Sequence, residues 1–265
     1  MRVAAIIPAR FASTRLPGKP LSLIHGWPMV RHVYERARRA KTLDDVVIAT
    51  DDPRVMDAVA AFGGRALMTS PSCPTGTDRL AEASKQIEAD IYVNVQGDEP
   101  MIDPDQIDAA VNGLLADAEA AISTLSLPLR TVEEMMSDAV VKVVTDARRH
   151  ALYFSRSPIP HGRTTARSLE AAAGAAIASG MARKHVGLYV FRREALAAFA
   201  RLSPSAPEAL EQLEQLRALH HGLTILVEPV EGEGTVAVDT PEDLERARAL
   251  ISPILDIQPT TQAEA

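Results

Sequence analysis

Three cations within ten residues mark a candidate phosphate site near the start of the chain. Arg10, Arg15 and Lys19 lie in the run Pro8–Pro20, which also offers the hydroxyl of Ser13 and is stiffened by three prolines. Guanidinium and ammonium groups bind phosphate oxygens through charge-assisted hydrogen bonds. These residue types predict a loop that holds a polyphosphate, most naturally a nucleoside triphosphate. A merely solvated basic loop is disfavoured because apolar residues expected to be buried flank the run.

Two common phosphate-binding motifs are absent from this loop. In a Walker A motif a glycine stands five residues before the second glycine, but here Ser13 stands five residues before Gly18. Pro20 also replaces the Ser or Thr that should follow the lysine. The dinucleotide fingerprint of spaced glycines is missing as well. The loop therefore predicts a class of ligand without assigning a familiar nucleotide-binding mechanism.

Acidic residues end two other short apolar runs. Asp98 and Glu99 close the run that begins at Ile91, and Asp239 closes Val236–Asp239. Adjacent side chains at a strand end point in different directions, so we assign Asp98 to a ligand and expect Glu99 to cap a helix. Mg²⁺ binds through one or two carboxylates together with substrate phosphates, which suits Asp98. Residue type alone leaves Asp239 open between a metal ligand and a cap of the next helix.

The elements that position these residues follow an alternating pattern. Short β-branched runs alternate with amphipathic stretches, as in βα units of a parallel sheet. Because ligands bind at the carboxyl ends of strands in such sheets, the candidate residues should meet at one edge. The fold class is therefore α/β, a mostly parallel Rossmann-like sheet flanked by helices. The expected strands are Val3–Ile7, Val46–Ala49 and Ile91–Val95, and the expected helices are Pro28–Ala40, Pro53–Ala61 and Thr77–Glu88.

The second half of the chain is less regular. Residues about 128–205 are interpreted as an insertion that completes the substrate site and supplies a dimer surface, within one domain of residues 1–250. The segment Pro158–Lys184 is the weakest for order, and residues 251–265 are expected to fray. Strands are expected at Val140–Val144 and Val186–Phe191, one helix at Pro207–His220 with Leu210, Leu213 and Leu216 inward, and a last helix after Thr240.

Composition restricts the class of protein. The 265 residues, 46% of them hydrophobic, are enough for a sizeable core, and the net charge of -7 argues against a general nucleic-acid binder. Residues 1–50 nevertheless carry a net +6, so a local anion site is allowed. Cys73 is the single cysteine, which excludes an internal disulfide and disfavours cysteine chemistry. Val3–Ile7 is too short for a membrane span, so we expect a cytoplasmic protein without membrane partners.

Eight motifs, in order along the chain, resemble those of 3-deoxy-manno-octulosonate cytidylyltransferases, also called CMP-Kdo synthetases. The opening loop is shared with other sugar nucleotidyltransferases and indicates only the reaction class, while the later motifs carry the resemblance to this family. Trp27 and the stretch His161–Arg183 depart from the family pattern. The matching motifs begin at Ile6, Gly76, Val93, Ala139, Ala151, His185, Leu213 and Val238, and extend to about residue 250.

The resemblance implies a reaction and a set of roles. The enzyme would transfer CMP from CTP to the anomeric hydroxyl of 3-deoxy-manno-octulosonate (Kdo), releasing pyrophosphate, in lipopolysaccharide biosynthesis. It would use Mg²⁺ and act as a homodimer. The implied catalytic residues are Lys19, Asp98 and Asp239, with Asp98 and Asp239 as metal ligands. The implied nucleotide-binding residues are Arg10, Ser13, Arg15, Lys19, Gly76, Arg79 and Gln96, and the implied sugar-binding residues are Arg156, His185, Tyr189, Glu214 and Gln215.

Several rival functions stay open at this point. The acceptor could be another acidic sugar, such as sialic acid or an 8-amino Kdo. A non-catalytic nucleotide-binding protein is a rival from another class, but it has little need for both Asp98 and Asp239 beside Lys19. A glycosyltransferase that uses a finished nucleotide sugar is a third rival, and the acid-x-acid strand end typical of that class is missing here.

Overall fold

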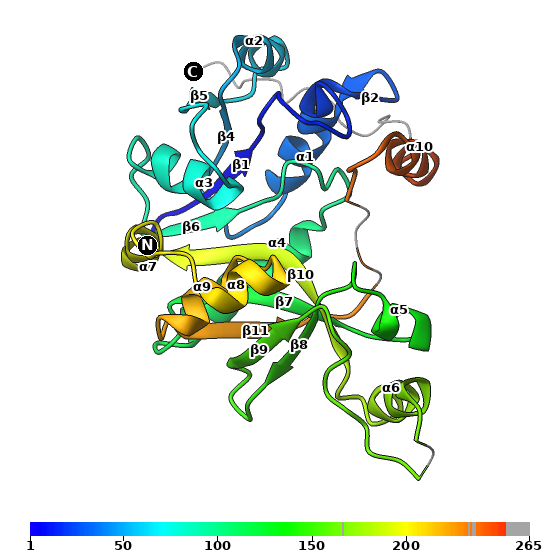
Figure 1. Ribbon diagram of the computed structural model, residues 1–265. Coiled ribbons are helices and arrows are strands. Elements are labelled where there is room, and N and C mark those ends of the chain that lie inside the picture. The colour runs from blue at the N-terminus through cyan, green and yellow to red at the C-terminus, as the bar shows by residue number, and fades with distance from the viewer. Residues whose placement is uncertain (166, 233, 235–236, 253–265) are drawn as a thin grey trace.

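A mixed β-sheet forms the centre of the molecule (Figure 1). The computed structural model describes residues 1–252 except 166, 233, 235 and 236. Within this part the main path of the sheet runs β11-β7-β10-β6-β1-β4-β5, and β10 alone lies antiparallel to its neighbours. The strands of this path are β1 (Val3–Pro8), β4 (Asp45–Thr50), β5 (Ala66–Met68), β6 (Ile91–Asn94), β7 (Ile122–Pro128), β10 (Arg183–Arg192) and β11 (Ile225–Pro229).

Helices cover both faces of this sheet. Alternate residues of β1 point to opposite faces: Ala5 and Ile7 pack with one group of helices, and Ala4 and Ile6 with the other. The first group is α1 (Met29–Ala37), α2 (Pro53–Ala61) and α4 (Pro104–Ala116). The second group is α3 (Gly76–Ser84), α7 (Arg193–Phe199) and α9 (Gln215–His220). The predicted α/β class, with a mostly parallel sheet between helical layers, is confirmed.

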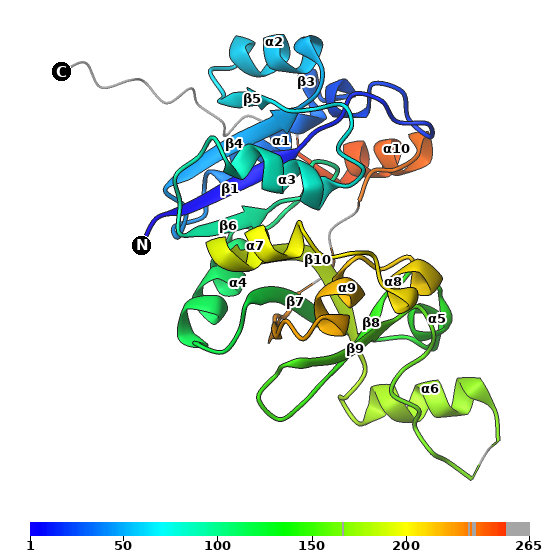
Figure 2. The same ribbon diagram turned by 60° about the vertical axis from the view of Figure 1, so that its left-hand side comes forward.

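The remaining elements lie at the ends and margins of the sheet. The β8–β9 hairpin pairs with the start of β10, and α5 and α6 pack together beside it (Figure 2). Helix α10 packs its buried Leu244 and Ala247 against Ile24 and Met29. These elements are β2 (Leu23–Ile24), β3 (Trp27–Pro28), α5 (Val132–Met136), β8 (Lys142–Thr145), β9 (Ala151–Ser155), α6 (Leu169–Ala178), α8 (Ala206–Glu211) and α10 (Pro241–Leu250).

The predicted helix Pro207–His220 is wrong, because the chain forms two short helices there. Gln212 adopts a left-handed conformation with φ of 55° and ends α8, so α9 starts in a new direction. Leu213 and Leu216 are buried as expected, whereas Leu210 on the separate α8 is 86% exposed. The break places Glu214 immediately before the first turn of α9.

One further expectation needs correction, and one helix was not predicted. The residue that caps the helix after β6 is Asp103, whose side chain accepts a hydrogen bond from the Asp105 amide, rather than Glu99. A tight turn over residues 99–102 delays the helix to Pro104. The segment Pro158–Lys184 contains the ten-residue helix α6, and its expected weakness of order stays a prediction. In α6 the Ser168 side chain caps the N-terminus, and alanines pack against α5.

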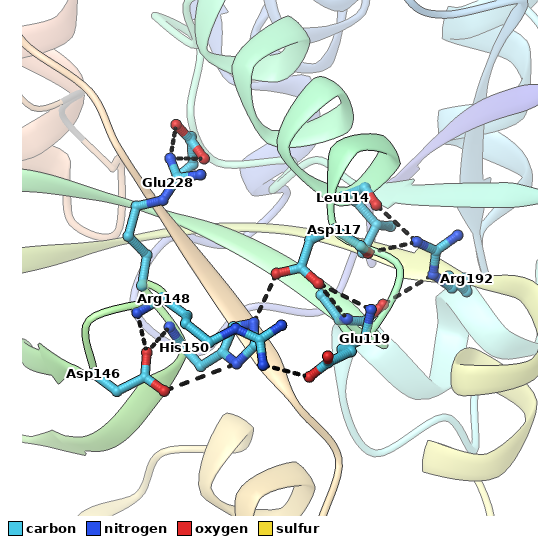
Figure 3. Close-up of polar contacts among 10 residues, drawn as sticks. Leu114, Asp117, Glu119, Asp146, Arg148, His150, Arg192 and Glu228 are labelled. Carbon is cyan, nitrogen blue, oxygen red and sulfur yellow. Dashed lines mark hydrogen bonds and ion pairs between the residues drawn. The ribbon is translucent and has the colours of Figure 1, made fainter.

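A polar network fastens the β8–β9 turn to the sheet edge (Figure 3). The Arg192 guanidinium at the end of β10 donates to three carbonyls, which belong to Leu114, Asp117 and Ala120. The Asp117 carboxylate lies 2.7 Å from His150 Nε2 in the turn. Two exposed ion pairs complete the network, Arg148 with Glu119 and Arg149 with Glu228. These contacts explain how a hairpin outside the main path keeps a fixed position.

The division into one domain with an insertion at about 128–205 stays a prediction. Strand β10, which falls within that range, runs between β6 and β7 in the main sheet. Most of the predicted frayed tail, residues 253–265, lies outside the described residues, as does Val236. Within the part that the structure describes, no helix has the length and apolar character needed to cross a membrane.

Candidate active site

A cleft of about 430 Å³ opens at the carboxyl ends of β1 and β6. The chain passes from β1 to β4 on one side and returns to β6 on the other, so this is the switch point where ligands bind in open α/β sheets. Gly97 allows the end of β6 to approach β1, because a Cβ there would lie 2.3 Å from the Pro8 carbonyl oxygen. The sequence-predicted residues that line the cleft are Arg10, Ser13, Arg15, Lys19, Gly76, Arg79, Gln96, Asp98 and Asp239.

One ammonium group joins the two candidate metal ligands. Lys19 Nζ lies 2.6 Å from Asp98 Oδ2 and 2.9 Å from Asp239 Oδ1. Arg15 Nη2 also lies 2.9 Å from Asp239 Oδ1. The Asp239 side chain therefore faces the cleft, and the cap of α10 is Thr240, whose hydroxyl accepts from the Asp243 amide. The Lys19 cation thus contacts a carboxylate that lies 220 positions away in the sequence.

The donor set at this point fits a hard divalent cation. Two carboxylates, one in the loop after β6 and one in the loop before α10, already contact the same ammonium group, and carboxylate oxygens are the ligands that Mg²⁺ prefers. Among the described residues, no group of three or more His, Cys, Asp or Glu side chains is placed to hold a metal. A metal here would therefore complete its coordination with oxygens from substrate and water, as Mg²⁺ usually does.

Arg79 lines the cleft, but its guanidinium contacts other protein side chains. Its Nη2 lies 2.9 Å from Asp51 Oδ2, and its Nη1 donates to the Thr69 hydroxyl. The other Asp51 oxygen accepts a hydrogen bond from the Phe11 amide at 3.3 Å. Phe11 lies in the run Pro8–Pro20, the predicted phosphate-binding loop, called the phosphate loop below. Asp51 thus ties the loop to α3, a role that sequence reasoning missed. Its place directly after β4, at the same sheet edge as Asp98, was the available signal.

Cys73 also lies on the cleft wall. Burial, assisted by a hydrogen bond to Glu82, raises the pKa of the Cys73 thiol to about 11. The thiol therefore stays protonated at neutral pH, and the thiolate is the nucleophilic form of cysteine. This agrees with the expectation from the sequence that cysteine chemistry is disfavoured.

The predicted sugar-binding residues His185 and Tyr189 lie together on β10. Their ring centroids are 5.3 Å apart, and His185 Nε2 lies 2.9 Å from the Thr124 hydroxyl. Burial lowers the pKa of His185 to about 3, so the imidazole is neutral at physiological pH. Burial, with a smaller contribution from the Glu214 charge, raises the pKa of Tyr189 well above its usual value. Both side chains therefore present uncharged hydrogen-bonding groups.

Glu214 and Gln215 approach the same cluster from the start of α9. Thr75 Oγ1 and Thr77 Oγ1 donate to the Glu214 carboxylate at 2.9 and 2.7 Å. Burial raises the pKa of Glu214, although both hydrogen bonds oppose that rise. Gln215 is buried, and its Nε2 has no hydrogen-bond partner among the described residues. The two threonines were not singled out from the sequence, because their importance depends on a contact with a residue about 140 positions away.

Arg156 is held in a different way from that expected of a carboxylate receptor. Its guanidinium donates to the backbone carbonyls of Asp138, Glu211 and Gln212, so it caps the end of α8. The buried Lys142 ammonium donates to three carbonyls, including that of Arg156. The described cleft is lined by other residues, and a sugar-binding role for Arg156 stays a prediction.

Comparison with known proteins decides the family. Residues 4–225 match the cytidylyltransferase family model. A 3-deoxy-manno-octulosonate cytidylyltransferase from Geobacter metallireducens is 52% identical over 248 residues, covering 93% of this chain and 96% of the relative. The chain belongs to the 3-deoxy-manno-octulosonate cytidylyltransferase family. A second member, from Geobacter sulfurreducens, is also 52% identical and covers 93% of this chain and 98% of its own.

A solved structure supports the same cytidylyltransferase assignment. It is a CMP:2-keto-3-deoxy-manno-octonic acid synthetase in complex with CTP, 44% identical in sequence, with a TM-score of 0.85. The match covers 94% of this chain and 98% of the other. The predicted family resemblance and the predicted enzyme class, a nucleotidyltransferase, are therefore confirmed. The individual site residues stay predictions, although the cytidylyltransferase fold brings nine of them to one cleft.

Proposed function

We propose that this cytidylyltransferase transfers CMP from CTP to the anomeric hydroxyl of Kdo, giving CMP-Kdo and pyrophosphate for lipopolysaccharide biosynthesis. The bond between the α-phosphorus and the bridging oxygen breaks, a bond to the sugar oxygen forms, and the hydroxyl proton is released. The observation that carries the proposal is the convergence of Asp98 and Asp239 on Lys19 in a cleft lined by the phosphate loop.

The nucleotide would lie along the phosphate loop. Arg15 and Lys19, which line the cleft, would neutralise the departing pyrophosphate, and this would be electrostatic stabilisation of charge that develops in the transition state. Ser13 and Arg10 would bind phosphate or base. Gly76, Arg79 and Gln96 would shape the cytidine pocket, Arg79 by keeping α3 and the loop together through Asp51.

The proposed cofactor is Mg²⁺, held by Asp98 and Asp239. When bound there, it would supply Lewis-acid stabilisation of phosphate charge and lower the pKa of a coordinated hydroxyl. Lys19 would then be free to turn from the two carboxylates toward the phosphates, a short movement for a flexible side chain.

The sugar acid would bind on the β10 side of the site. His185 and Tyr189 offer neutral polar groups, while Glu214 and Gln215 offer an acceptor and an unsatisfied donor. Such a lining suits a polyol whose hydroxyls both donate and accept. Arg156 would contribute to the sugar carboxylate if α8 shifts on binding, because its guanidinium is occupied by carbonyls here.

A substrate panel tests this function. The purified protein would be given CTP and Mg²⁺ with Kdo, 8-amino Kdo or sialic acid, and pyrophosphate release would be followed. We expect turnover with Kdo to exceed that with sialic acid by orders of magnitude. Turnover with sialic acid but none with Kdo would contradict the substrate assignment, and CTP binding without turnover on any acceptor would favour the non-catalytic rival.

We further propose a cytoplasmic homodimer. The β8–β9 hairpin exposes Leu152 and Tyr153 at 62% and 37%, which are large apolar side chains for a solvated surface. They lie in the segment assigned to the dimer surface from the sequence. Light scattering coupled to size-exclusion chromatography measures the mass directly. A dimer that dissociates in a Leu152→Asp variant supports this surface, and a wild-type monomer would contradict it.

A further inference from the structure

Glu214 is fastened by the first turn of α3, which also forms part of the nucleotide cleft. Thr75 and Gly76 line the cleft, and Thr77 follows them in the same turn. Thr77 Oγ1 donates to Glu214 Oε2 at 2.7 Å, and Thr75 Oγ1 lies 2.9 Å from Glu214 Oε1. One turn of helix therefore faces the nucleotide on one side and the Glu214 carboxylate on the other.

The direction of each hydrogen bond follows from counting hydrogens. A threonine hydroxyl has one hydrogen, and Thr77 gives it to Glu214. The Thr77 oxygen can then only accept, and it accepts from Asn94 Nδ2 at 3.3 Å. The result is a directed relay from the Asn94 amide at the end of β6, through Thr77, to the Glu214 carboxylate.

The Thr75 hydroxyl has more hydrogen-bond partners than the Thr77 hydroxyl. It lies 2.7 Å from Asp78 Oδ2 and accepts from the Asp78 amide, so Thr75 belongs to the capping box of α3. Its single hydrogen is shared between Asp78 and Glu214. Thr77 has no capping duty, and its hydroxyl contacts Glu214 and Asn94. Thr77 is therefore the residue at which the relay can be cut without uncapping the helix.

Two polar atoms in this cluster lack partners among the described residues. They are Asn94 Oδ1, an acceptor, and Gln215 Nε2, a donor, and both side chains are more than 90% buried. Asn94 is the direct cross-strand partner of Tyr189, and Gln215 follows Glu214. An acceptor and a donor left open in one buried cluster suit a guest that carries hydroxyl groups, because a hydroxyl can satisfy both.

We propose that Thr77 is a positioning residue that orients the Glu214 carboxylate for the sugar acid and, through the first turn of α3, couples the sugar side of the site to the nucleotide cleft. This inference rests on the proposed function. Nucleotide binding would fix the turn that contains Thr75 and Gly76, and the same turn would hold Glu214 through Thr77. The chain would thus bind the sugar acid more tightly once CTP is in place.

The test compares Thr77→Val, which keeps the shape but removes the hydroxyl, with Thr77→Ser, which keeps the hydroxyl. For Thr77→Val we expect KM for Kdo to rise about tenfold or more, as for the loss of one hydrogen bond to a charged group, while the Kd of a non-hydrolysable CTP analogue measured without Kdo changes less than about twofold. Thr77→Ser should restore KM for Kdo to within about threefold of wild type. The matched control is Thr131→Val, which removes a threonine cap from α5, outside the cleft.

A second measurement addresses the coupling itself. Kdo affinity would be measured by calorimetry with and without a non-hydrolysable CTP analogue and Mg²⁺. In the wild type we expect the analogue to tighten Kdo binding, and in Thr77→Val this gain should shrink about fivefold or more, the scale of a typical coupling between two sites.

Equal losses of affinity for Kdo and for the CTP analogue measured alone would overturn the inference, as would an unchanged KM for Kdo or an unchanged gain in affinity. A wild-type protein that does not turn over Kdo at all would instead refute the proposed function. The two failures are therefore distinguishable.

Discussion

The two halves of the site differ in charge and in contact with solvent. Around the phosphate loop, Arg15, Lys19, Asp98 and Asp239 are charged, and their side chains are 64%, 14%, 29% and 37% exposed. On the β10 side, burial pushes His185, Tyr189 and Glu214 toward their neutral forms. Under the proposed function, the charged half would exchange ionic partners with CTP, whereas the half on β10 would bind the hydroxyl groups of Kdo through side chains that burial shifts toward their neutral forms.

This contrast also explains where substitutions should act. Charge removed from the solvated half should change the rate with little effect on folding, because partly exposed ion pairs contribute little to stability. Changes on the β10 side should alter the unfolding free energy and its dependence on pH. A buried polar group that loses its hydrogen-bond partner is still removed from water, which costs free energy. Each of the following experiments tests one side of that contrast.

Asp98→Asn should have the largest effect. Removing one carboxylate from the centre of the solvated half should lower kcat by about a thousandfold, the scale of losing a preorganised electrostatic group. Asp239→Asn should lower kcat by about a hundredfold or more on the same grounds. Pyrophosphate release with CTP, Kdo and Mg²⁺ measures both. The exposed Asp57→Asn is the matched control, and an Asp98→Asn enzyme with wild-type kcat would remove Asp98 from the catalytic site.

Arg79→Met should lower the free energy of unfolding by the amount typical of a buried ion pair, although Arg79 lines the cleft. The Arg79 and Asp51 side chains are 3% and 13% exposed, and losing one partner of a buried pair costs about 3 kcal/mol or more of unfolding free energy. Urea unfolding followed by circular dichroism gives this value. A loss below about 1 kcal/mol, the range of exposed pairs, would show that Arg79 serves the nucleotide alone.

His185 should make the protein less stable in acid. Its pKa is lowered to about 3 in the folded state, so between about pH 6.5 and pH 3 the unfolded chain binds a proton that the folded chain does not. Stability should therefore decrease as the pH is lowered through that window, by up to about 1.4 kcal/mol per pH unit for this one group. Burial also lowers the pKa of His32, which adds to the wild-type slope.

The measurement is the unfolding free energy at several pH values for the wild type and His185→Gln. Below pH 6.5 the unfolding free energy of the variant should depend less steeply on pH than that of the wild type. The difference in slope should correspond to at most one proton taken up on unfolding. The exposed His220→Gln is the matched control for replacing a histidine by glutamine. An unchanged slope in His185→Gln would mean that this imidazole takes up a proton in the folded state, which would break the contrast between the two halves.

Arg148→Met should have the smallest effect. Arg148 and Glu119 are 58% and 63% exposed in the network at the sheet edge (Figure 3), and such pairs contribute less than about 1 kcal/mol. Thermal unfolding should show a small change that disappears at high salt. A loss as large as that of Arg79→Met would show that exposure does not separate the two classes of ion pair.

The sequence was most informative where function lies in one continuous run. The position of Arg10, Arg15 and Lys19 at the cleft could be predicted from the sequence, because a loop after the first strand has a defined place in an α/β sheet. Asp98 could be placed by the same argument. The buried strands were also predictable, since β1, β4 and β6 are apolar nearly throughout.

What the sequence left out depends on contacts between distant segments. The Glu214 cluster needs the first turn of α3, the end of β6 and the start of α9 together, and no local pattern brings them there. The break at Gln212 was missed because glutamine rarely adopts a left-handed conformation. Arg156 was assigned to the sugar from family resemblance, but its contacts with three carbonyls depend on where α8 ends.

The measurement that tests the central claim most directly is product analysis by ³¹P NMR. The purified protein would be incubated with CTP, Kdo and Mg²⁺, and with each component omitted in turn. The account predicts CMP-Kdo and pyrophosphate in equal amounts only in the complete mixture, and neither product with Asp98→Asn on the same timescale. Consumption of CTP without a sugar-linked CMP, or an undiminished yield with Asp98→Asn, would contradict it.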